Sequence, residues 1–121
     1  MISFDLRHVT LDLLLADLEP DTPTSFALAD GQRVCLVRVG DQVYALEDQC
    51  SHQAMPLSAG YVLPPNESTT GPVIECAWHG ARFLCTTGEP TRGPATDTVA
   101  TYEVRLEGDR VIVGTRRPAL G

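Results

Sequence analysis

The chain has 121 residues, 43% of them hydrophobic and 21% charged, which suits one ordered domain over residues 1–121 with its own apolar core. Its net charge of −7 argues against nucleic acid or an anionic membrane as a partner, because both attract an excess of Lys and Arg. The charge suits a basic protein partner, and it also serves solubility alone.

We expect neither a membrane helix nor a secretory signal from this sequence. It contains no run of about 18 apolar residues, the length that a membrane helix requires. The segment from Met1 to Asp12 carries acidic residues and lacks the long apolar stretch with basic flanks of a secretory signal. We therefore expect a cytoplasmic protein with no membrane association. In that reducing compartment, four cysteines favour metal binding over disulfides.

The predicted elements begin with a helical turn over Leu11–Leu18, for which Thr10 is the candidate N-cap. The rest of the flanking sequence predicts short strands of an antiparallel meander, separated by Asp-Gly and Gly-Asp turns. The predicted strands are Thr24–Ala29, Arg33–Val39, Gln42–Leu46, Thr101–Leu106 and Arg110–Val113.

The middle section, about residues 47–92, is rich in Gly, Pro, Ser, Thr, Cys and His and has little periodicity. It contains a Cys-x-His pair, Cys50 and His52, and a Cys-x-x-His pair, Cys76 and His79. Each pair offers one thiolate and one imidazole on a Gly/Pro-rich loop. Four such ligands can bind tetrahedral zinc or an iron–sulfur cluster, and the spacing alone does not decide between them.

The residues around the two pairs resemble the two cluster-binding boxes of Rieske proteins, in particular the soluble Rieske ferredoxins that serve bacterial dioxygenases. The first box is Cys50–Gln53 with Pro56–Gly60, and the second is Cys76–Phe83 with Thr87–Glu89. The resemblance implies an all-β fold, a small antiparallel β-sandwich or partly open barrel. The cluster-binding loops would form an inserted subdomain at about residues 47–92.

The resemblance also implies one [2Fe–2S] cluster, with Cys50 and Cys76 on the inner iron and His52 and His79 on the outer iron. Two neutral imidazoles in place of two thiolates make the cluster less negative, so it accepts an electron more easily. The implied function is one-electron transfer from a ferredoxin reductase to a terminal oxygenase, by a monomer. The scattered acidic residues suggest no acid–base site, and we expect no catalytic residues.

The neighbours of the boxes bear on the reduction potential. High-potential Rieske proteins have a serine and a tyrosine where Ala81 and Phe83 stand, and a cysteine pair where Met55 and Trp78 stand. Fewer donors to the cluster sulfurs leave their negative charge less stabilised. We therefore expect a potential at the low end of the Rieske range, about −150 mV.

The spacer between the boxes, the two remaining cysteines and His8 are not expected to bind the cluster. The spacer between the boxes is longer than usual, with the excess in Leu63–Pro72, which is either a tolerated surface insertion or a partner-recognition loop. Cys35 and Cys85 are expected to be buried core residues, and His8 a surface histidine. Three alternatives to a dioxygenase ferredoxin remain: a small nitrite reductase subunit, a redox sensor and a zinc-stapled interaction module.

Overall fold

The structure is a computed structural model that describes residues 11–28, 31–49, 55–63, 71–77, 80–92 and 98–117. The candidate N-cap Thr10 and the histidine His8 lie outside these ranges. Within them, ten strands form two antiparallel sheets, with six strands in the first sheet and four in the second. The predicted all-β fold class is confirmed.

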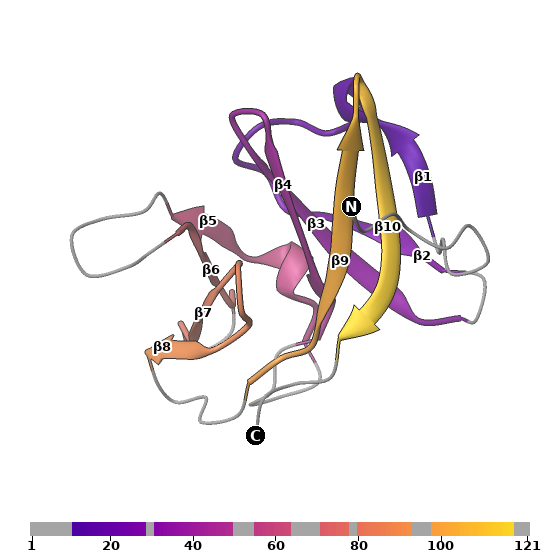
Figure 1. The fold of residues 1–121 in the computed structure, drawn as a ribbon. Coiled ribbons are helices and arrows are strands. Elements are labelled where there is room, and N and C mark those ends of the chain that lie inside the picture. The colour runs from indigo at the N-terminus through magenta and orange to yellow at the C-terminus, as the bar shows by residue number, and fades with distance from the viewer. Residues whose placement is uncertain are drawn as a thin grey trace.

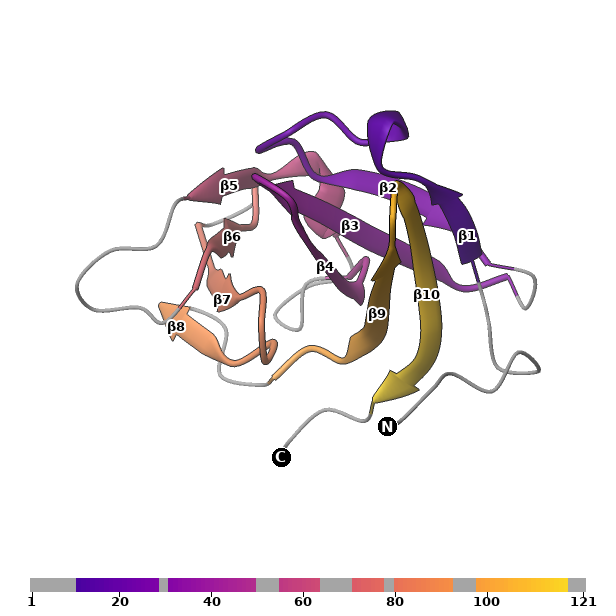
Figure 2. The same cartoon turned by 45° about the horizontal axis from the view of Figure 1, so that its top comes forward.

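The first sheet has the strand order β1-β10-β9-β4-β3-β2 and curls into a half-barrel, as Figures 1 and 2 show. Its strands are β1 (Leu11–Leu14), β2 (Thr24–Ala27), β3 (Arg33–Val39), β4 (Gln42–Glu47), β9 (Thr101–Glu107) and β10 (Arg110–Arg117). Every strand predicted from the sequence is present. The strand β10 is longer than predicted, because it continues past Val113 through a register shift and pairs again with β9.

The predicted helical turn over Leu11–Leu18 is wrong. Leu11–Leu14 is the strand β1, which pairs with β10, and only Leu15–Asp17 forms a single 3-10 turn, η2. The reason is the period of the apolar residues. Leu11 and Leu13 alternate with exposed neighbours and pack into the core, so a strand buries them while its backbone completes the edge of the sheet.

The second sheet is built from the middle section and has the order β5-β6-β7-β8. Its strands are β5 (Tyr61–Leu63), β6 (Val73–Glu75), β7 (Arg82–Leu84) and β8 (Pro90–Arg92), and the 3-10 turn η3 (Leu57–Ala59) precedes them. Strands of three residues are too short to show alternation, so the sequence did not reveal them. Leu63 pairs with Val73, so the excess length expected in Leu63–Pro72 falls in the β5–β6 connection, whose residues 64–70 are outside the described part.

Strand β3 is buried on both faces, and this is what holds the two sheets together. Val34 and Leu36 face the core inside the half-barrel, whereas Cys35 and Val37 face a second core that includes residues of the second sheet. A nearly continuous apolar run is the expected sequence of such a doubly covered strand. The second core contains Cys35, Val37, Leu46, Leu57, Ile74, Cys76, Ala81, Phe83, Cys85 and Val99.

Candidate functional site

Of the four predicted ligands, the structure describes Cys76, which follows β6 and is 1% exposed. Cys50, His52 and His79 lie outside the described residues, as does Trp78. What the structure does give is the chain on both sides of each predicted ligand loop. The site can therefore be built from the elements that carry the two loops.

The second loop is the connection between β6 and β7. The backbone N–H of Cys76 donates a hydrogen bond to the carbonyl of Ala81, at 2.7 Å. Gly80 has a φ of 71°, which only glycine adopts without strain. One residue further out, Arg82 Nε lies 2.7 Å from Glu75 Oε1, so an ion pair joins the two strands beside the loop. Backbone bonds and a charged pair thus close this loop at its base.

The surroundings of Cys76 are apolar. Leu57, Ala81 and Phe83 are fully buried and belong to the same core as Cys76, and Met55 packs against that core. A thiolate is costly in such a place unless a metal shares its charge. This environment fits one thiolate ligand of a buried iron–sulfur cluster. Neither Ala81 nor Phe83 carries a hydroxyl that could donate to a sulfur.

The first loop leaves the half-barrel after β4 and returns in η3. At its start, the N–H of Asp48 donates to the carbonyl of Arg33 on β3, at 3.1 Å. At its end, Ser58 donates to Asp48 twice, from its N–H to Oδ1 and from its hydroxyl to Oδ2, both at 2.8 Å. The sequence did not reveal this contact, because Asp and Ser are common loop residues and nothing in their spacing indicates that they meet.

The two other described cysteines are core residues, as predicted. Cys35 is 0% exposed and Cys85 is 2% exposed, and both are free thiols. Burial raises the pKa of Cys85 to about 12. Burial, and next the negative charge of Asp48, raise the pKa of Cys35 well above its ordinary value. Both thiols therefore stay protonated at neutral pH, which suits packing and not metal binding.

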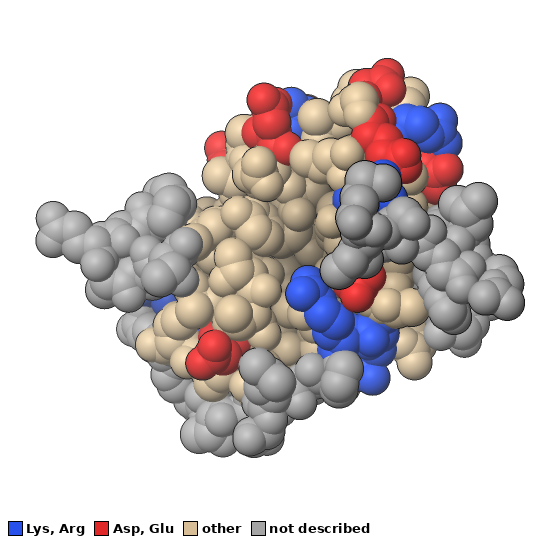
Figure 3. Space-filling model, in the orientation of Figure 1, with Lys and Arg blue, Asp and Glu red and all other residues tan. Residues whose placement is uncertain are grey.

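Acidic side chains stand at the exposed turns of the half-barrel. Asp41 lies in the β3–β4 turn and Asp109 in the β9–β10 turn, and both are exposed. Figure 3 shows most of the acidic groups in that view at this end of the molecule, above the second sheet. Near the end of β10, Arg116 Nη2 lies 3.1 Å from Glu47 Oε2. In that view, the negative charge of the described residues is therefore concentrated at the end of the half-barrel that carries the β3–β4 and β9–β10 turns.

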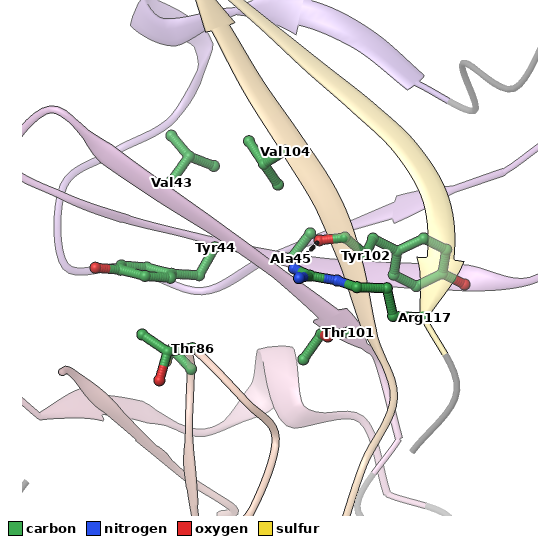
Figure 4. Close-up of a pocket in the computed structure, with 9 residues that line it drawn as sticks. Val43, Tyr44, Ala45, Thr86, Thr101, Tyr102, Val104 and Arg117 are labelled. Carbon is green, nitrogen blue, oxygen red and sulfur yellow. Dashed lines mark hydrogen bonds between the residues drawn. The ribbon is translucent and has the colours of Figure 1, made fainter. Parts of the chain in front are cut away.

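A hollow of about 180 Å³ lies where the half-barrel meets the second sheet. Figure 4 shows the Tyr44 ring beside Thr86, and Arg117, whose Nη2 donates to the carbonyl of Tyr102 at 3.3 Å. The hollow is lined by Val43, Tyr44, Ala45, Cys85, Thr86, Thr101, Tyr102, Val104 and Arg117. This mixture of apolar and polar side chains contains no convergent set of metal ligands.

In the described part of the chain, no helix is long and apolar enough to span a membrane.

Comparison with known proteins gives consistent matches. The model of the Rieske [2Fe-2S] domain matches residues 9–103. Ferredoxin CarAc of Metapseudomonas resinovorans is 34% identical over 103 residues, which cover 84% of this chain and 90% of the relative. The solved ferredoxin of carbazole 1,9a-dioxygenase from Nocardioides aromaticivorans IC177 is 37% identical, with a TM-score of 0.74 and coverage of 89% of this chain and 95% of that chain.

A second solved structure is a complex of reduced oxygenase and oxidized ferredoxin in carbazole 1,9a-dioxygenase. The matched chain is 31% identical to this one, with a TM-score of 0.74. The match covers 92% of this chain and 94% of the other. The likeness therefore extends over nearly the whole of both chains.

Proposed function

The chain belongs to the Rieske [2Fe–2S] domain family, and we propose that it is the ferredoxin component of an aromatic-ring dioxygenase system, passing single electrons to a terminal oxygenase. The resemblance predicted from the two boxes is confirmed, and so is the [2Fe–2S] cluster as cofactor. The chain would not catalyse a reaction itself.

The observation that carries this proposal is the mutual coverage with ferredoxins. The match to ferredoxin CarAc covers 84% of this chain and 90% of that protein. The biphenyl dioxygenase ferredoxin subunit of Pseudomonas sp. (strain KKS102) is also 34% identical, and the match covers 75% of this chain and 78% of that one. This likeness is to separate electron-carrier subunits, which supports a carrier of the same kind.

We assign the cluster to Cys50 and Cys76 on the inner iron and to His52 and His79 on the outer iron. The burial of Cys76 in an apolar core supports an inner position for it. When bound, the cluster supplies reversible one-electron chemistry. The protein's role is to hold the ligands, to exclude water from the inner iron and to leave the histidine-bound iron accessible to a partner. We take residues 1–121 as one domain, with residues 47–92 as its cluster-binding subdomain.

For partners, we propose a ferredoxin reductase as the electron donor and the terminal oxygenase as the acceptor. The solved complex of a ferredoxin with the oxygenase of carbazole 1,9a-dioxygenase supports the second. We further propose that the protein works as a cytoplasmic monomer.

The proposal is tested by coupled electron transfer. Holoprotein is added to NADH, the reductase of an aromatic-ring dioxygenase and cytochrome c as the final acceptor. The rate of cytochrome c reduction should rise in proportion to the holoprotein concentration. Cys76→Ser should abolish the increase, whereas Cys85→Ala, which removes another buried thiol of the same core, should leave it. A rate that does not depend on the holoprotein would contradict the proposed function.

A further inference from the structure

The two ends of the first ligand loop are joined by one carboxylate. Asp48, two residues before Cys50, accepts a hydrogen bond from the N–H of Ser58 and another from its hydroxyl, both at 2.8 Å. Hydrogen bonds to a charged acceptor are stronger than those between neutral groups. Both contacts are partly buried, which protects them from competition with water.

The geometry of η3 explains why Asp48 is needed there. The first N–H groups of a helical turn have no partner within the turn, and a side chain at the N-cap usually accepts from one of them. Here the N-cap residue is Pro56, which makes no side-chain capping bond. Asp48 takes over this role from ten residues earlier in the chain. The interaction that caps η3 therefore also connects the start of the first loop to its end.

Both sides of this bond rest on fixed parts of the fold. The N–H of Asp48 donates to the carbonyl of Arg33 on β3. Ser58 follows Leu57, which is 0% exposed and belongs to the same core as Cys35 and Val37 of β3. The Asp48–Ser58 bonds thus fix how far apart the two ends of the first loop lie. They fix this distance relative to β3, the strand that contributes to both cores.

The second loop is closed in a different way. There the backbone itself forms the closing hydrogen bond, from the Cys76 N–H to the Ala81 carbonyl. Among the described residues at the two ends of the first loop, 47–49 and 55–58, the bonds to Asp48 are the hydrogen bonds that connect one end to the other. Between the described ends of the first loop, a side chain thus provides the closure that the second loop obtains from its backbone.

We propose that Asp48 and Ser58 are positioning residues that hold the first loop at the span in which Cys50 and His52 bind the cluster. This inference rests on the proposed function, because it takes those two residues as ligands. The pair would act on the cluster through the loop that it closes. Loss of the pair should therefore let the loop open and release iron, while the half-barrel stays folded.

The experiment measures the rate at which holoprotein loses its cluster to an iron chelator, followed by visible absorbance. Asp48→Ala removes both bonds and should accelerate the loss at least tenfold, and Ser58→Ala removes one and should accelerate it less. The double variant should be no faster than Asp48→Ala, because the bonds are already gone. Asp48→Asn keeps one oxygen acceptor for the Ser58 N–H and can donate from its amide to the Ser58 hydroxyl, but it lacks the charge, so its rate of cluster loss should lie between those of wild type and Asp48→Ala.

Matched controls separate positioning from general loss of stability. Ser25→Ala removes a serine hydroxyl that accepts a hydrogen bond from Arg33 Nε at 2.9 Å, and Asp12→Ala removes a carboxylate that pairs with Arg110 at 2.6 Å. Both changes lie in the half-barrel and should leave the rate of cluster loss within twofold of wild type. Urea unfolding and the electron paramagnetic resonance line shape are recorded for every variant.

The outcomes distinguish the inference from the proposed function. A cluster-loaded wild type whose Asp48→Ala and Ser58→Ala variants lose the cluster no faster than Asp12→Ala and Ser25→Ala would overturn this inference alone. If Asp48→Ala does not fold, the comparison of Ser58→Ala with Ser25→Ala decides by the same criterion. A wild-type protein that assembles no [2Fe–2S] cluster would overturn both the proposed function and the inference.

Discussion

A Cβ atom at position 60 would overlap the carbonyl oxygen of Glu75, so Gly60 touches the backbone of the strand that leads into the second of the two proposed ligand loops. Gly60 itself directly follows η3, where the first loop ends. The exit of one loop is therefore packed against the entry of the other, one residue before Cys76. Only a residue without a side chain permits this approach.

The first prediction concerns Gly60→Ala. The new methyl group would meet backbone atoms that cannot rotate away, so we expect unfolding free energy to fall by about 3 kcal/mol and cluster incorporation to drop. Gly40→Ala is the control, since Gly40 has a φ of 60° but nothing within 4 Å of its Cβ position. Its cost should be about 1 kcal/mol, from backbone strain alone. Urea unfolding that gives equal losses for both variants would contradict the close approach.

The second prediction concerns the ion pair beside the second loop. The side chains of Glu75 and Arg82 are 23% and 36% exposed, so breaking the pair should cost less than about 1 kcal/mol of stability. Its charges should matter more for reduction, because a nearby negative charge disfavours an added electron. We expect Glu75→Gln to raise the potential and Arg82→Gln to lower it, each on the order of tens of millivolts. A redox titration in which both variants shift in the same direction would refute this.

The third prediction is a loss of stability in alkali caused by Cys85. Its pKa is about 12 in the folded protein and near 9.0 when the thiol is unburied, so the folded state holds the proton more tightly. This contribution is fully present below about pH 9 and disappears as the pH rises toward 12, by about 1.4 kcal/mol per pH unit. Urea unfolding between pH 8 and pH 11 should therefore show a steeper fall for wild type than for Cys85→Ala. Parallel curves would mean that the thiol is not buried as described.

The fourth prediction concerns the potential itself. Ala81 is fully buried in the core that contains Cys76 and offers no hydroxyl to the cluster. We expect a wild-type potential of about −150 mV, and Ala81→Ser should raise it by adding a donor. Ala45→Ser, which adds a hydroxyl at a buried position of the other core, should leave the potential unchanged. Protein-film voltammetry measures all three proteins, and a clearly positive wild-type value would contradict the prediction.

How far the sequence predicts the fold depends on the length of each apolar pattern. The run Arg33–Val39 is long, rich in β-branched residues and followed by a Gly-Asp turn, and β3 has these same bounds. The run from Leu11 predicts a helical turn wrongly, because five leucines in eight residues fit such a turn as well as a strand edge. The strands of the second sheet have three residues each, too few to show a period, and their pairing with one another reveals them.

For the site, the sequence indicates the residue types and their spacing but not the supporting contacts. The two Cys/His pairs are specific, because one thiolate and one imidazole on each of two Gly/Pro-rich loops are typical of a metal centre. The Asp48–Ser58 closure and the Gly60–Glu75 approach depend on how distant backbone segments meet. No local pattern encodes that meeting, so the three-dimensional structure is needed to find it.

The most direct test of the account is an electron paramagnetic resonance spectrum of the purified protein before and after dithionite, with iron, sulfide and zinc counted in the same sample. The account predicts a silent oxidised protein with two irons and two sulfides per chain, and a rhombic signal of the Rieske type after reduction by one electron. A colourless protein that holds one zinc and no sulfide, even after anaerobic reconstitution, would contradict it. The four proposed ligands would then form a structural zinc site, and the assignment as an electron carrier would be withdrawn.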